Sequence, residues 1–425
     1  MSKITHTVKS HWRQLNIVMR NEYAHIFRDA GVILIMVFAP LIYATIYSLT
    51  YGSQVLRNVP IGVVDMSKTD TSRKLIEAIG MGPNTVIAYE LDDMIEAERK
   101  FYERDIYGII YIPDNYEKML LGGQMATVSI CLDASYMLMY RQAFQEMVAG
   151  INTTGAMVEF QRLIARGAEI PQAKAITQPV IYQGHSLFNP YLGYGTFVMP
   201  PIIMLIIQQT LLIGIGMIGG TWREQGLYGK LKPKGSKRLS TLPIVTGKAL
   251  VYASIYAVSS FYLLNVHYRL FHYPMNGNAA TIAVFLAMYL FACIFMGIAV
   301  STLFRRRETS LMLMLWSSIP LFLLSGASYP AEAMPRWMVQ LASIFPSTHG
   351  APGFVRIQTM GASLAEVLPE IRALGRLIVI YLGLSCIGIH FLVETDLADT
   401  IRDNWKKRIA SRKTAARSAE DTPTN

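Results

Sequence analysis

The residues best placed to do chemistry are two aspartates, Asp65 and Asp133, each of which ends a predicted strand. Active-site carboxylates can lie at strand ends, but aspartate there also forms turns and helix caps, and this second interpretation is favoured. His267 and His272 flank the edge of an apolar stretch, where an interfacial role is the better interpretation. Because no group of His, Cys and carboxylate residues has metal-ligand spacing, we expect no metal site.

The short motifs of membrane-embedded and nucleotide-hydrolysing enzymes are absent from the sequence. There is neither a His-Glu-x-x-His nor a Gly-x-Ser-x-Gly. Gly247 and Lys248 are followed by Ala249 and lack the upstream glycine of a phosphate-binding loop. The sequence therefore predicts no catalytic site and no ATP hydrolysis by this chain itself.

Any functional residue must instead be positioned by apolar helices. One apolar stretch runs from Val32 to Tyr51, and five more lie between Tyr194 and Val393. Each is close to the roughly 20 residues that a bilayer-spanning helix needs. None has a charged residue or histidine in its middle, where a charge costs at least about 2.5–3.5 kcal/mol and usually marks ion coupling. We therefore expect that energy for any transport enters from outside the bilayer.

The distribution of charge indicates a membrane protein rather than a nucleic-acid-binding one. The chain is 52% hydrophobic and 16% charged, with a net charge of +10. Its basic residues cluster at the ends of the apolar stretches: Arg13, Arg20, Arg28, Arg223, Lys230, Lys232, Lys234, Lys237, Arg238, Arg305, Arg306, Arg307, Arg402, Lys406, Lys407, Arg408, Arg412 and Lys413. By the positive-inside rule, both termini and the basic loops are cytoplasmic and the large polar insert is outside.

These observations predict an α-helical integral membrane protein with six transmembrane helices in a 1+5 layout and an inserted extracytoplasmic α/β domain. The predicted parts are an amphipathic interface helix (1–28), the first span (29–52), the outer domain (53–189), spans two to six (190–395) and a basic cytoplasmic tail (396–425). A cytoplasmic loop (221–243) and an outer re-entrant hairpin (329–372) lie within the second group of spans.

The insert alternates strand and helix patterns, which indicates a small α/β domain with a mixed sheet. The expected strands are 59–65, 85–89, 106–112 and 127–132, and the expected helices are 71–79, 92–104, 115–121 and 139–166.

The N-terminal segment has apolar residues at three- and four-residue steps beside a basic face, which predicts an interfacial helix. The apolar positions are Val8, Trp12, Leu15, Met19, Tyr23 and Ile26. Two interpretations remain open: a simple membrane anchor, or a lever packed against a cytoplasmic partner.

The segment after the fifth span indicates a re-entrant hairpin, with a plain amphipathic loop as the alternative. It contains Pro330, Pro335 and Trp337, and an apolar stretch from Trp337 to Phe345 that is too short to cross and is stopped by Pro346. A second segment, 362–373, is expected to lead into the last span.

Taken in order, the motifs along the chain resemble the membrane subunit of an ABC-2 type exporter, in the branch with a large outer domain after the first helix. The motifs are Phe188-Asn189-Pro190, Phe197 to Pro200, Ile207-Gln208, Arg223 to Gly226 with Leu231, Gly247-Lys248, Leu324 to Gly326, Tyr329-Pro330, Met334-Pro335, Trp337, Pro346 to Thr348 and Arg356. The chain departs from the family pattern at Leu227 and Gly229, where the family usually has Thr and a second Glu.

The resemblance implies a permease that forms a homodimer or a heterodimer with a sister permease and docks on a separate ATP-binding cassette subunit. That subunit would bind ATP and Mg²⁺, so no cofactor is expected in this chain. The motion would be received by a coupling set of residues: Arg223, Glu224, Gly226, Leu231, Arg20 and Tyr23. A periplasmic adaptor with an outer-membrane channel, and membrane lipids, are further expected partners, and a bacterial inner membrane is the expected location.

Four uncharged polar residues at or near the second span, Asn189, Gln208, Gln209 and Thr210, are candidates for a substrate pathway. Hydrogen bonds between helices are an equally good interpretation. The expected cargo is an amphipathic small molecule or a lipid-like molecule. The alternatives to an exporter subunit are a structural or assembly protein whose outer domain binds partners, and a sensor that passes an outer signal to the basic loops.

Overall fold

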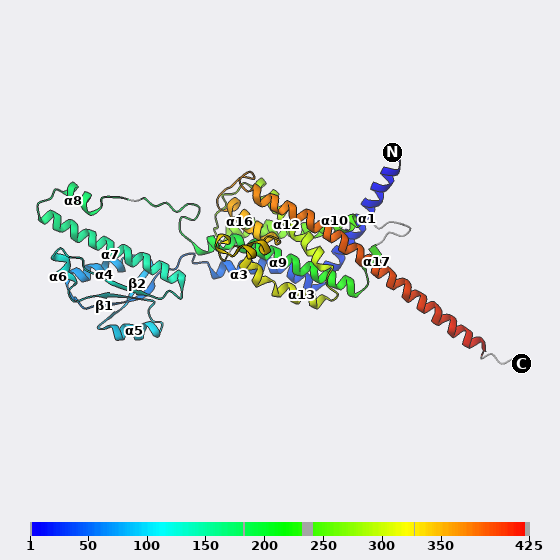
Figure 1. Cartoon of the computed structure of the whole chain (residues 1–425), viewed down its shortest axis with the longest axis horizontal. Helices are drawn as coiled ribbons and strands as arrows, with labels where there is room; N and C mark the ends of the chain where they lie inside the picture. The colour runs from blue at the N-terminus through cyan, green and yellow to red at the C-terminus, as the bar shows by residue number, and fades with distance from the viewer. Residues whose placement is uncertain (1, 182, 232–240, 327, 421–425) are drawn as a thin grey trace. The chain divides into compact units, whose positions relative to one another are not determined.

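The chain separates into two units, a helical unit formed by residues 1–52 and 187–425 and an inserted unit formed by residues 53–186. The computed structural model describes residues 2–181, 183–231, 241–326 and 328–420 (Figure 1). The basic stretch from Lys232 to Arg238, which belongs to the predicted cytoplasmic loop, lies outside the described residues.

The inserted unit is a mixed four-stranded sheet in the order β2-β1-β3-β4. The strands are β1 (Val59–Asp65), β2 (Thr85–Leu91), β3 (Gly108–Ile112) and β4 (Ser129–Leu132). β1 pairs in parallel with β2 and β3, while β3 pairs antiparallel with β4. The predicted alternation of strands and helices, including the mixed sheet, is therefore confirmed.

Helices cover both faces of this sheet (Figure 1). One face packs against α4 (Asp70–Gly80), α6 (Tyr116–Leu121) and α7 (Met137–Ala165), and the other against α5 (Met94–Tyr102). The short α8 (Ile170–Thr177) follows α7 and packs against it. Both faces of β1 and β3 are buried, which explains why these strands are continuously apolar rather than alternating.

The helical unit begins with α1 (Ser2–Arg28), and a span of 21 residues, Ala30–Thr50, follows it. This span consists of α2 (Ala30–Ile33), the π-helical turn η1 (Leu34–Phe38) and α3 (Ala39–Thr50). Pro40 lies in the first turn of α3 and lacks an N–H, so the π turn occurs where the regular hydrogen-bond pattern is interrupted.

The part of the chain after the inserted unit contains most of the long helices. These are α9 (Tyr194–Glu224), α10 (Leu242–Phe261) continued by η3 (Tyr262–His267) and α11 (Tyr268–Leu270), α12 (Ala279–Ser301) and α17 (Leu368–Glu420). Together with Ala30–Thr50, the described residues contain five helical stretches long and apolar enough to cross a membrane. The charged side chains in these spans, such as Lys248 and Arg376, lie toward their ends.

The stretch predicted as the fifth span is a broken helix. It consists of α13 (Arg307–Trp316) and α14 (Ser318–Leu324), of 10 and 7 residues, and neither is long enough to count among those five. The chain is thus a helical integral membrane protein, and its sixth crossing stays a prediction.

The predicted outer hairpin contains a helix that the sequence did not indicate. After the turn η4 (Ala331–Ala333) come α15 (Arg336–Ala342) and α16 (Pro346–Gln358). The predicted second segment, 362–373, does lead into the last span, but it is helical only from Leu368, where α17 begins, and α16 is an additional helix before it. Pro346 ends no helix; it occupies the first turn of α16, where proline is well tolerated.

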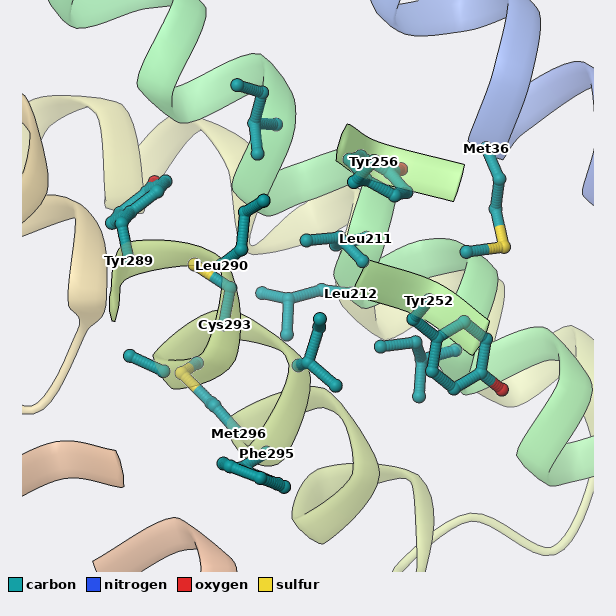
Figure 2. Close-up of a cluster of buried hydrophobic side chains, with 14 of the residues drawn as sticks. Met36, Leu211, Leu212, Tyr252, Tyr256, Tyr289, Leu290, Cys293, Phe295 and Met296 are labelled. Carbon is teal, nitrogen blue, oxygen red and sulfur yellow. The ribbon is translucent and has the colours of Figure 1, made fainter. Parts of the chain in front are cut away.

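The helical unit packs around α9, whose apolar segment is 94% buried. Side chains of α9, α10 and α12 meet in one cluster that includes Leu211, Tyr256 and Cys293 (Figure 2). Glycines on α9 allow close approach: a Cβ at Gly220 would lie 2.8 Å from the Arg307 backbone, and one at Gly216 would lie 2.1 Å from Ser310 Oγ. Small residues at such positions are typical of helix packing in membranes, where close van der Waals contact stabilises association.

Candidate functional site

The segments that the sequence singled out for coupling meet at one end of the helical unit, which we call the Glu22 end. There α1, the last turn of α9, the 3-10 turn η2 (Tyr228–Leu231), the start of α10 and the link between α12 and α13 come together. The opposite end, where α9 and α17 begin near η4, is called the Pro330 end.

A buried ion pair joins α1 to α10 at the Glu22 end. Glu22 is 0% exposed and Lys248 is 3% exposed, with 2.6 Å between Lys248 Nζ and Glu22 Oε2. The hydroxyl of Tyr252 donates a hydrogen bond to the other carboxylate oxygen. Removing one member of such a pair leaves the other charge buried without compensation, at a cost of about 3–5 kcal/mol. The pair therefore fixes the position of α1 on α10.

Aromatic rings enclose the ion pair. Lys248 Nζ lies 4.3 Å from the centre of the Trp222 ring, a cation–π contact, and Trp222 in turn packs against His25 and Tyr228. Burial, together with the negative charge of Glu22, raises the pKa of Tyr228 far above its usual value, so this hydroxyl stays neutral. The enclosure keeps water from the ion pair and connects it to α9.

The end of α9 is shaped by the residues of the predicted Arg223 to Leu231 segment. Gly226 has φ +57°, and the N–H groups of Gly226 and Leu227 donate to the carbonyls of Arg223 and Trp222 at 3.1 and 2.9 Å. This is a Schellman cap, in which glycine takes the left-handed conformation without steric cost. The cap turns the chain into η2, where Leu231 is buried.

Arg223 and Glu224 bind the link between α12 and α13. Arg223 Nη1 donates to the Thr302 carbonyl at 3.0 Å, and the Arg307 N–H donates to Glu224 Oε1 at 3.0 Å. The first bond satisfies a carbonyl beyond the end of α12, and the second satisfies an N–H at the start of α13. These two side chains therefore hold both ends of the same connection.

A second ion pair ties this connection to the first span. The Arg307 guanidinium contacts both carboxylate oxygens of Asp29, which also accepts hydrogen bonds from the N–H groups of Gly31 and Val32. Partial burial opposes ionisation of Asp29, but the hydrogen bonds from Arg307 and the backbone outweigh it and hold the pKa below its ordinary value. The Tyr228 N–H donates to Asp396 at 3.1 Å and so adds α17 to the network.

The face by which α1 packs overlaps the predicted apolar face in part, since Ile26 is fully buried and Met19 and Tyr23 pack against the core. Its most buried residues at the Glu22 end are Gln14, Val18, Glu22 and Ile26, at four-residue steps, whereas Trp12 is 67% exposed. The side chain of Val8 lies outside the described part. Gln14 Nε2 donates to the Leu231 carbonyl at 3.4 Å, so α1 contacts η2 directly.

Of the two coupling residues predicted on α1, one is partnered. Tyr23 lies within hydrogen-bond distance of Ser254 on α10, at 2.5 Å between the two oxygens. Arg20 is exposed and, among the described residues, makes no hydrogen bond or ion pair. The structure thus places Tyr23 against α10, whereas Arg223, Glu224, Gly226 and Leu231 lie at the end of α9 and in η2, and the role of all five in coupling stays a prediction.

Sequence reasoning missed the centre of this network. Glu22 lies between predicted apolar positions of α1, and Lys248 was considered only as part of a failed phosphate-loop motif and of the Gly-Lys resemblance. A usable signal was present, because an acidic residue on an otherwise apolar helix face and a lysine just inside an apolar span each need a partner. Asp29, Arg307 and Asp396 carried no comparable signal.

The predicted pathway residues make hydrogen bonds within the helical unit. Gln208 is 0% exposed; it donates to Ser347 Oγ at 3.0 Å and accepts from the Ser347 N–H at 2.8 Å, which joins α9 to the start of α16. Tyr256 donates to Thr210 Oγ1 at 2.9 Å, joining α10 to α9. These contacts favour the interpretation as hydrogen bonds between helices.

The remaining two pathway candidates are placed differently. Gln209 donates to the Met314 carbonyl at 3.3 Å, and its Oε1 has no hydrogen-bond partner among the described residues. Asn189 lies before α9 and exchanges two hydrogen bonds with the Gly193 backbone, at 2.9 and 3.0 Å. Asn189 therefore shapes the loop that leads into the span.

The predicted hairpin residues form the turns at the Pro330 end. Pro330 and Pro335 precede η4 and α15, where their fixed φ suits the start of a helical turn. Trp337 is 65% exposed, and Pro346 is buried at the start of α16.

The candidate chemical residues of the inserted unit serve local structure. Asp65 accepts hydrogen bonds from the N–H groups of Ser67 and Lys68 at 3.0 and 3.1 Å, which is an aspartate turn. Hydrogen bonds from Ser135, and then the Arg104 guanidinium, hold the pKa of Asp133 below its usual value. Within the described ranges, no three His, Cys, Asp or Glu side chains are grouped so that they could hold a metal ion.

Comparison with known proteins gives a consistent result. Residues 30–387 match the model of the ABC-2 family transporter proteins. The inner membrane transport permease YhhJ of Escherichia coli K12 is 24% identical over 381 residues, covering 85% of this chain and 92% of that protein. The probable multidrug ABC transporter permease YbhR of the same organism is 21% identical over 353 residues, covering 83% and 92%. ABC transporter G family member 20 of Dictyostelium discoideum is 21% identical over 349 residues, covering 81% and 46%.

Proposed function

Because this chain belongs to the ABC-2 family of transporter proteins, we propose that it is the permease subunit of an ATP-driven exporter. In this proposal it moves an amphipathic small molecule or a lipid-like molecule out of the cytoplasm or the inner leaflet. A separate ATP-binding cassette subunit binds ATP and Mg²⁺ and hydrolyses the nucleotide. Two relatives, named as a transport permease and a probable multidrug permease, support a transport function.

The proposed topology has six crossings, with both termini and the Glu22 end in the cytoplasm of a bacterial cell. Two positions of the chain support the sixth crossing. Arg307 lies at the Glu22 end, where it contacts Glu224, and Tyr329 lines a cavity at the Pro330 end. Only α13 and α14 lie between these points. The basic residues gathered near the Glu22 end support its cytoplasmic assignment.

One observation carries the proposed mechanism: the buried Glu22–Lys248 pair attaches the interface helix α1 rigidly to α10. Through Trp222, Glu224 and Arg307, the same network reaches α9 and α13. A displacement of α1 or η2 by the ATP-binding subunit would therefore move several spans together. ATP binding stabilises one packing of the helices and hydrolysis returns the other, so differential affinity for the two states performs the work.

The proposed assembly is a dimer of permeases, either of identical chains or with a sister permease. Large apolar side chains remain exposed along α13 and α14, including Leu315, Trp316 and Ile319, and a dimer seam or lipid would cover them. The inserted unit is the proposed extracytoplasmic domain and the place where a periplasmic adaptor, linked to an outer-membrane channel, would bind.

The test is reconstitution with and without the ATP-binding subunit. Expressed with its candidate ATP-binding partner, the chain should copurify with it, and amphiphiles should stimulate ATP hydrolysis in vesicles. Reconstituted alone under a proton or sodium gradient, it should transport nothing. Transport under those conditions, or failure to bind any ATP-binding subunit, would contradict the proposal and favour the sensor or assembly alternatives.

A further inference from the structure

The Pro330 end of the helical unit contains a cavity of about 780 Å³ that the coupling network does not use. Its walls come from the first turns of α9, from the segment between α14 and η4, and from one side each of α16 and α17. Pockets that hold drug-sized molecules have volumes of about 300–1,000 Å³ and are lined mainly by apolar groups with a few polar ones. The size of this cavity is therefore that of a ligand site.

Much of the lining is apolar and comes from packed helices. Phe197 and Pro201 of α9 line the cavity together with Ala351 and Val355 of α16. From α17 come residues at three- and four-residue steps, which lie on one side of the helix. Such a wall suits the ring system or hydrocarbon part of an amphipathic molecule.

The charged residues around the cavity are not all neutralised. Arg356 donates to Glu370 Oε1 and to the Glu366 carbonyl, both at 2.7 Å, so its charge is compensated. Arg376, which also lines the cavity, makes no hydrogen bond or ion pair within the described part of the chain.

The position of Arg376 makes its missing partner significant. It lies within the apolar span Leu368–Asp396, about 12 Å along the helix from Leu368 at the usual rise per residue. Even toward the end of a span, an unpaired guanidinium among apolar residues is favoured only where it faces water or an anion, and ionisable residues within spans usually mark a functional site.

We propose that this cavity binds an amphipathic anion, whose phosphate, sulfonate or carboxylate group pairs with Arg376 while its apolar body lies against Phe197, Pro201 and Val355. Glu332 of η4 lines the same cavity and repels a second negative charge, so a singly charged head group fits best. The inference rests on the proposed export function, because the occupant is either cargo on its way out or an anionic lipid of the surrounding leaflet.

The test is equilibrium binding of radiolabelled taurocholate, a singly charged amphiphile, to the full chain in phosphatidylcholine nanodiscs. No ATP-binding subunit or nucleotide is added, so a failed binding test does not depend on coupling. Empty nanodiscs measure partitioning into lipid. We expect saturable binding that Arg376→Gln weakens about tenfold, the usual effect of losing a charge-assisted hydrogen bond.

Three variants control the sign and the position of the charge. Arg372→Gln removes an exposed guanidinium one turn earlier on α17, outside the cavity lining, and should leave affinity unchanged. Glu332→Gln should tighten binding roughly two- to threefold by removing repulsion. If Arg376→Gln does not fold, Arg376→Lys keeps the charge without the planar donor fork and should give intermediate affinity.

Addition of phosphatidylglycerol to the nanodiscs separates the two sources. Competition with taurocholate identifies an anionic lipid as an occupant, and its absence shows that the site prefers the soluble amphiphile to the lipid; both outcomes support the site. Binding that does not saturate, or that Arg376→Gln and Arg376→Lys leave unchanged, overturns the proposal. So does tighter binding of dodecyltrimethylammonium that is lost in Glu332→Gln.

Discussion

The two ends of the helical unit carry the same kinds of charged side chain in opposite circumstances. At the Glu22 end, Glu22 and Lys248 are almost fully buried and bind each other. At the Pro330 end, Arg376 and Glu332 are exposed around a cavity and, among the described residues, bind no partner. The comparison teaches that charge in this membrane protein has two uses: paired charges hold helices together, and unpaired charges remain available to a ligand.

The largest effect is expected from breaking the buried pair. Glu22→Ala leaves the Lys248 ammonium buried without its counter-charge, so the helical unit should lose about 3–5 kcal/mol of stability. The double variant Glu22→Leu with Lys248→Met removes both charges and should recover most of that loss. Thermal unfolding in detergent, followed by tryptophan fluorescence, compares the three proteins. A single variant that melts with the wild type would show that the pair does not hold α1.

If the double variant is stable but fails to couple ATP hydrolysis to transport, the pair also has a role in transmission. Restored stability with normal coupling would limit it to a structural role. The distinction sharpens the comparison, because removal of a charge at the Pro330 end, at Arg376 or Glu332, should change ligand affinity and leave stability unchanged.

A smaller effect is expected at the half-buried Asp29–Arg307 pair. The pKa of Asp29 in the folded protein lies below its ordinary value of 3.8, so its contribution to stability is present above that value. It is lost as the pH falls through the folded pKa, because the unfolded chain then binds the proton more readily. Asp29→Asn should cost about 1–2 kcal/mol at neutral pH.

The pH dependence checks the assignment. Below about pH 4 the melting temperature of the wild type should fall toward that of Asp29→Asn, and the two curves should converge. Parallel curves across this range would mean that the Asp29 carboxylate contributes nothing through its charge.

The third effect concerns Glu224 and is mainly functional. Glu224→Ala removes the acceptor for the Arg307 N–H and should cost about 1 kcal/mol, as the loss of a helix cap does. Membrane insertion should stay intact, while transport per ATP hydrolysed decreases in the reconstituted complex. Glu224→Gln keeps an acceptor oxygen and serves as the matched control. Unchanged transport in Glu224→Ala would remove this residue from the coupling set.

The smallest effect is expected for the hydrogen bonds between helices. Gln208→Leu breaks both bonds to Ser347 and should cost about 0.6 kcal/mol, the average for polar contacts in membrane bundles. Gln209→Leu removes one long hydrogen bond and an oxygen that already lacks a partner in the described structure, so it should be close to neutral. Altered substrate selectivity without a stability change in Gln208→Leu would restore the pathway interpretation.

Much of the fold followed from local sequence patterns. Apolar length located the five long spans, and alternation of patterns located the strands of the inserted unit, because both depend on neighbouring residues alone. The helix α16 was missed because Gly350, Pro352 and Gly353 are poor helix formers. Burial of the helix against α9 and α12 overrides that local preference.

The candidate site was predictable only in outline. The Arg223 to Leu231 segment was located by its resemblance to a family, and Gly226 was named without the reason that its positive φ now supplies. The buried position of Glu22 on α1 was not predicted, because charged residues normally face water.

The sequence by itself determined that this is a membrane protein with one large insert, because apolar length and charge position are readable along the chain. Only the tertiary structure decided which charges are paired. Glu22 and Lys248 lie 226 positions apart, and the chain offers each of them many other possible partners. Helical periodicity specifies which face of a helix is buried without specifying what packs against it. The contacts among α1, α9 and α10 made that choice, and they also left Arg376 facing a cavity with no partner of its own in the described structure.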